Sequence, residues 1–104
     1  MTEFLGKPIT PERVKEAYDL TGFLPLFGDF AKNIAGDECG CALTAMAAVD
    51  GGYPTAGAAY LESVSPNLNR DLWAFLSGFD NNGNKMYLDT IQYGLGLACR
   101  AVVT

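Results

Sequence analysis

The run from Ala42 to Val49 constrains the fold of this 104-residue chain more than any other segment. Alanine fills four of its eight positions, and Leu43, Met46 and Val49 add bulk. The run stops at Asp50-Gly51-Gly52, a combination typical of a helix end. We therefore expect a helix from about Cys39 or Gly40 to Val49, with a flat face of small side chains that lets a neighbouring helix approach closely.

A first helix is indicated by the sequence Thr10-Pro11-Glu12. A hydroxyl N-cap, a proline in the first turn and an acid near the positive end of the helix dipole form a strong opening signal. Gly22 is placed to end this helix. Its expected inner face consists of Val14, Ala17 and Tyr18, with Phe23 as a further candidate.

Three more helices are expected towards the carboxyl end. One runs from Thr55 to Val64, and the next opens at Ser65-Pro66. A turn over Asp80–Asn84 should separate it from a last helix that runs from Lys85 towards Val102, whose Gly94 and Ala98 would face the alanine-rich helix. The helix that opens at Ser65-Pro66 has an apolar stripe at spacings of four, three and four: Leu68, Leu72, Phe75 and Phe79.

The segment from residue 23 to residue 30 is too apolar for a solvated loop. We expect an irregular apolar strap that packs between the first two helices, with a short helix from Asp29 to Ile34 as an alternative. Clean alternation of apolar and polar residues, which would indicate strands, is absent. The sequence therefore predicts one all-α domain over residues 1–104, built as an orthogonal or irregular bundle of about five short helices.

The balance of charge limits the partners. The chain has 12 acidic and 7 basic residues and a net charge of -5, and the basic residues are scattered. Nucleic acid is therefore not expected, because its binding depends on clustered Lys and Arg. The apolar runs 42–49 and 95–103 fall short of the ~20 residues that span a bilayer, and the N-terminus lacks the pattern of a secretory signal. We expect a cytoplasmic protein without a membrane partner.

The Cys39-Gly40-Cys41 motif is the candidate site for chemistry, in a chain without histidine. A zinc ion would need Cys39, Cys41, Cys99 and a carboxylate from Asp37 or Glu38. Residues two apart on a helix point in very different directions, since each residue turns by about 100°. The two thiols could therefore share an ion only if Cys39 lies outside the helix, at its cap.

Redox chemistry of Cys39 and Cys41 is the other hypothesis for this motif. A disulfide across one glycine would be strained and easily reduced. Asp37 and Glu38 oppose a thiolate by like-charge repulsion. The simpler interpretation places Cys39 half-exposed at a helix cap, with Cys41 and Cys99 packed in the core.

The favoured hypothesis is a small acidic binding domain that is not an enzyme, needs no cofactor and forms a homo-oligomer or binds a protein partner. No catalytic residues are assigned. The alternative is a thiol-dependent protein that uses Cys39 and Cys41 for redox chemistry or for zinc. Aromatic residues are numerous enough to line a pocket for a small apolar ligand: Phe23, Phe27, Phe30, Tyr53, Tyr60, Trp73, Tyr87 and Tyr93.

Overall fold

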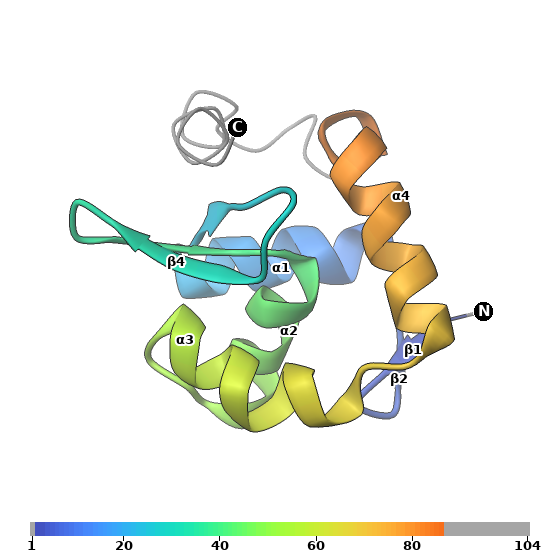
Figure 1. Cartoon of the computed structure of the whole chain (residues 1–104), viewed down its shortest axis with the longest axis horizontal. Helices are drawn as coiled ribbons and strands as arrows, with labels where there is room; N and C mark the ends of the chain where they lie inside the picture. Colours follow the sequence, from blue (N-terminus) through green and yellow to red (C-terminus); the bar gives the residue numbers. More distant parts are fainter. Residues whose placement is uncertain (1, 87–104) are drawn as a thin grey trace.

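The computed structural model describes residues 2–86 and has a mixed α/β fold, in which two small sheets and several helices surround one central helix (Figure 1). The expected all-α bundle is therefore wrong. Five short strands lie within the described residues, and none is longer than four residues. Strands this short carry almost no alternating pattern, so the helical signals dominated the sequence.

The first sheet is a small antiparallel hairpin at the N-terminus. It pairs β1 (Glu3–Phe4) with β2 (Lys7–Pro8). Leu5 and Gly6 connect the strands with φ angles of 55° and 78°. Positive φ at both central residues matches the right-handed twist of a two-residue hairpin. The hairpin brings the buried Phe4 side chain to the core.

The second sheet has three strands in the order β3-β5-β4. The middle strand β5 (Asp37–Gly40) is parallel to β3 (Leu24–Pro25) and antiparallel to β4 (Ala31–Ile34). Ala35 and Gly36, with φ angles of 53° and 90°, join β4 to β5. The hairpin of β4 and β5 extends past the helices on one side of the molecule (Figure 1).

Helix α1 (Pro11–Thr21) confirms the first predicted helix and both of its ends. The Thr10 hydroxyl accepts a hydrogen bond from the Arg13 backbone N–H at 3.1 Å. Gly22 ends the helix in the left-handed conformation, with φ of 72°. The predicted inner face is correct, because Val14, Ala17 and Tyr18 are buried. Phe23, the further candidate, is also buried but lies beyond the end of the helix.

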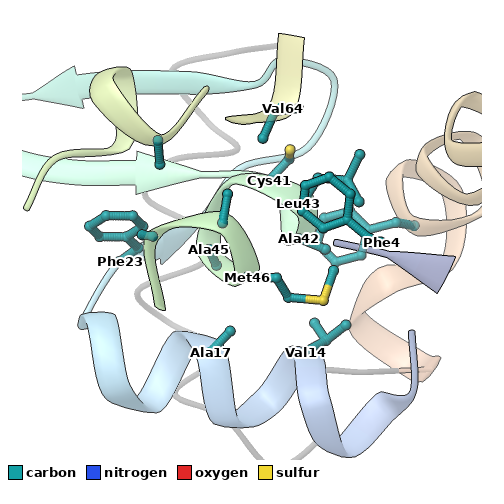
Figure 2. Close-up of a cluster of buried hydrophobic side chains, with 14 of the residues drawn as sticks. Phe4, Val14, Ala17, Phe23, Cys41, Ala42, Leu43, Ala45, Met46 and Val64 are labelled. Carbon is teal, nitrogen blue, oxygen red and sulfur yellow. The ribbon is translucent and has the colours of Figure 1, made fainter. Parts of the chain in front are cut away.

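Helix α2 (Ala42–Gly51) lies at the centre of the molecule, and its first seven residues are buried. It contacts α1, α3, α4 and β5. In Figure 2, Val14 and Ala17 of α1 point towards Met46 of α2, and Phe4 closes the same cluster. The helix begins two or three residues later than expected, because the segment before it belongs to β5 and Cys41 is the N-cap.

Short helical segments of three kinds follow α2. They are α3 (Ala56–Ala59), the π-helical turn η1 (Tyr60–Val64) and the 3₁₀ turn η2 (Ser65–Asn67). The predicted helix from Thr55 to Val64 is thus present as α3 and η1, and Thr55 caps it through its hydroxyl. Ser65-Pro66 begins η2 instead of the long helix.

Helix α4 (Arg70–Met86) carries the predicted apolar stripe. Leu72 and Phe79 are buried, and Leu68, just before the helix, and Phe75 pack against the core. The turn expected over residues 80–84 is wrong, because α4 continues to Met86. The helix expected from Lys85, with its Gly94 and Ala98 stripe, lies outside the described residues except for its first two.

The apolar strap of residues 23–30 packs against the core as expected. Phe23, Leu26 and Phe27 are buried, and β3 forms part of the segment. The alternative helix from Asp29 to Ile34 is wrong, because Ala31–Ile34 is strand β4. Among the described helices, none is long and apolar enough to cross a membrane.

Candidate functional site

The Cys39-Gly40-Cys41 motif lies where the central strand β5 passes into helix α2. Cys39 has an exposed fraction of 0% and Cys41 of 1%. The expectation of a half-exposed Cys39 at a helix cap is therefore wrong. Cys39 belongs to β5, which has a partner strand on each side, and it packs against Leu26.

Cys41 has a free thiol, so the two cysteines of the motif do not form a disulfide with each other. Its sulfur lies 3.4 Å from the Thr44 hydroxyl. Burial raises the pKa of the Cys41 thiol, since a thiolate would lose its hydration in the core. The thiolate is the reactive form of cysteine, so this environment opposes nucleophilic chemistry.

Gly40 has a packing role between the two cysteines. A Cβ atom at this position would lie 3.0 Å from Thr44 Cγ2 and 3.4 Å from Phe23 Cδ2. The Gly40 carbonyl accepts a buried hydrogen bond from the Tyr18 hydroxyl at 2.8 Å. Burial raises the pKa of Tyr18 well above its usual value, so the hydroxyl remains a donor. The motif thus joins α1, the strap and α2.

The two acids that precede the motif have different surroundings. The Glu38 carboxylate accepts hydrogen bonds from the Ala56 N–H at 2.8 Å and from the Asn33 amide. It therefore fixes the start of α3, while Asp37 is exposed. Within residues 2–86, no group of three or more Cys, Asp, Glu or His side chains is arranged to hold a metal ion.

A second candidate site, which we call the aromatic-acid pocket, lies between α4 and the loop before β4. Its volume is about 220 Å³. Helix α4 contributes side chains at spacings of three, four and seven residues, and the loop provides the opposite side. The lining residues are Gly28, Asp29, Phe30, Trp73, Leu76, Ser77 and Asp80. The sequence predicted aromatic residues at a pocket but missed its two acids, because Asp80 was assigned to a turn.

The aromatic rings of this pocket form a connected group. Phe30 stacks on Tyr60 with ring centroids 4.7 Å apart, and meets the Trp73 ring edge-on at 5.6 Å and 78°. Trp73 is nevertheless 54% exposed. The Tyr60 contact holds Phe30 in place, so Trp73 presents an ordered aromatic surface to solvent.

Asp80 forms the polar end of the pocket. Its carboxylate accepts a hydrogen bond from the Gly28 N–H at 3.0 Å. Partial burial raises the pKa of Asp80, and the hydrogen bond from Gly28 offsets only part of that effect. A positive charge placed beside this carboxylate would stabilise its ionised form.

A third feature, which we call the uncharged depression, lies beside α1 and α2. Its volume is about 400 Å³, and it contains no charged side chain: it is lined by Leu20, Thr21, Phe23, Ala48, Val49, Gly52, Tyr53 and Pro54. Leu20 is 65% exposed and Val49 is 38% exposed. Three other depressions on the described surface each include charged side chains.

Comparison of the chain with protein-family models, with curated proteins and with solved structures finds no match.

Proposed function

We propose that this chain is a cytoplasmic binding domain without catalytic activity, and that it associates with a second copy through the uncharged depression. The observation that carries the proposal is the complete lack of charge among the residues that line this surface. Two copies with a net charge of -5 repel each other, and the repulsion is weakest where uncharged surfaces meet.

The exposed apolar side chains support the same choice of surface. Leu20 of α1 and Val49 of α2 are among the large hydrophobic residues that solvent reaches, and both line the depression. Burial of apolar surface is the main driving force of association. A two-fold arrangement would place the same depression on both sides of the interface.

The thiol alternative has less support. Redox chemistry or zinc binding by Cys39 and Cys41 would require thiols that a reagent or an ion can reach, but Cys39 is disulfide-bonded and both side chains are buried. The raised pKa of Cys41 further opposes a thiolate.

The proposal is tested by light scattering coupled to size-exclusion chromatography at high micromolar concentration. We expect a dimer for the wild type and a monomer for Leu20→Lys, because lysine would bring a charge and its hydration into the interface. Leu61→Lys is the matched control, since Leu61 is 68% exposed and lies outside the depression. A monomeric wild type, or equal loss of the dimer in both variants, would contradict the proposal.

A further inference from the structure

We infer that the aromatic-acid pocket binds the guanidinium group of an arginine side chain presented by a partner polypeptide. This inference does not depend on self-association, because the pocket shares no lining residue with the uncharged depression. It depends on the two walls of the pocket, its size and its charge.

The aromatic wall suits a cation. Trp73 is about half exposed, and Phe30, which is held by Tyr60, supports its position. The electron-rich face of an aromatic ring attracts a positive charge, and tryptophan does so most strongly. A guanidinium group is planar and weakly hydrated, so it can stack on such a ring without a large cost of desolvation.

The acidic wall supplies the complementary charge. Asp29 lies 3.6 Å from Lys32, in a pair whose two side chains are each 39% exposed. Pairs this exposed contribute little stability and are readily exchanged. Among residues 2–80, whose side chains the structure describes, no ion pair involves Asp80. Its carboxylate is therefore available for an incoming cation while Oδ1 keeps the hydrogen bond from Gly28.

The size of the pocket suits a single side chain better than a large ligand. Its volume of about 220 Å³ is below the roughly 300–1,000 Å³ of typical sites for small molecules and cofactors. One side chain is a better match. An anion would be repelled by the two carboxylates. A neutral apolar group would remove hydration from the Asp80 carboxylate and would offer no hydrogen bond in return.

Arginine fits this pocket better than lysine. The guanidinium group donates hydrogen bonds in its plane while its face stacks on a ring, so it can contact Asp80 and Trp73 together. An ammonium group is a compact and strongly hydrated charge, and it cannot stack in this way.

Trp73 is the only tryptophan of the chain, so its fluorescence reports directly on the pocket. We would titrate the full chain with the tripeptide Gly-Arg-Gly, blocked at both ends, at constant ionic strength. Gly-citrulline-Gly is the matched neutral control, and Gly-Lys-Gly tests the choice of cation. We expect saturable binding of the arginine peptide, at least about fivefold weaker binding of both other peptides, and weaker binding at high salt.

Two variants locate the binding. Asp80→Asn keeps an oxygen that can accept the hydrogen bond from Gly28 and removes only the charge. Asp71→Asn removes the same charge from an exposed position of α4 outside the pocket. We expect Asp80→Asn to weaken binding by about three- to tenfold, and Asp71→Asn to leave it within about twofold.

Each remaining outcome overturns the inference. No saturable change for the arginine peptide, equal binding of the citrulline peptide, or equal losses in the two variants would exclude a cation site. Equal binding of the lysine peptide would exclude the assignment to guanidinium. Circular dichroism of each variant establishes that a loss of binding does not arise from unfolding.

Discussion

At the scale of single residues, Gly40 is a position where a larger side chain would meet packed neighbours. A methyl group there would meet Thr44 at 3.0 Å and Phe23 at 3.4 Å, inside a packed core. We expect Gly40→Ala to lower the free energy of unfolding by about 1–3 kcal/mol, the usual cost of overpacking. Urea denaturation measures this change. Gly57→Ala is the control, since a Cβ in that helical position meets nothing within 4 Å. Equal midpoints for the two variants would refute the argument.

The chemistry of Cys41 gives a second test at this scale. The thiol is buried and its pKa is raised, so we expect negligible alkylation by iodoacetamide in native buffer and rapid alkylation in denaturant. Peptide mass spectrometry assigns the modification to Cys41 and separates it from the other cysteines. Rapid labelling of native Cys41 would instead restore the hypothesis of a reactive thiol.

Asp80 provides a prediction about pH. Its pKa is raised in the folded protein, so the folded state binds the proton more tightly than the unfolded chain does. The contribution of Asp80 to stability is therefore greatest in acid and is lost as pH rises through the raised pKa. Asp80→Asn lacks this dependence. We expect the stability of the variant relative to wild type to increase from acidic to neutral pH in urea denaturation, and the opposite trend would contradict the assigned cause.

At the scale of elements, Glu38 connects the sheet to α3. Its carboxylate accepts the Ala56 N–H at the first turn of that helix. We expect Glu38→Ala to cost about 1–2 kcal/mol in the free energy of unfolding, as loss of a helix cap does. Asp37→Ala, on the neighbouring exposed position, should change stability by less than about 0.5 kcal/mol. Chemical denaturation compares the two, and a larger effect of Asp37→Ala would show that the cap is unimportant.

The elements also show which parts of the fold the sequence predicts. Helix α1 carried a complete signal, with Thr10 and Pro11 at its start and Gly22 at its end, and all three act as expected. The strands carried almost none: β3 has two residues, and Ala35 adopts a positive φ that alanine rarely takes. Strand β3 pairs with β5 and not with the next strand along the chain, and β5 also packs against α2. Local sequence patterns do not reveal such contacts.

The same limit applied to the candidate sites. The exposure of Cys39 was predicted from the geometry of a helix, on which residues two apart point in different directions. Cys39 lies instead in the central strand β5, where that geometry does not apply. The aromatic-acid pocket could have been recognised from Trp73, Ser77 and Asp80, whose spacing places them on one helical face. The expected turn over residues 80–84 concealed that spacing.

At the scale of the whole molecule, the chain combines a net charge of -5 with a depression, on the part of its surface that the structure describes, whose lining carries no charge. Long-range repulsion between copies therefore opposes any association, and burial of apolar surface at the depression favours it. Added salt screens the first effect much more than the second. We therefore expect the dissociation constant of the dimer to fall as the salt concentration rises.

This balance also predicts how stability depends on protein concentration. A dimer of folded chains shifts the unfolding equilibrium by mass action, so the thermal midpoint of the wild type should rise as the chain is concentrated. Differential scanning calorimetry over a hundredfold range of concentration measures the rise, at low and at moderate salt. Leu20→Lys should have a midpoint that does not depend on concentration, while Leu61→Lys should follow the wild type, because only Leu20 lines the depression. A wild-type midpoint that stays constant over this range would show that the depression does not bind a second copy, whatever the behaviour of the variants.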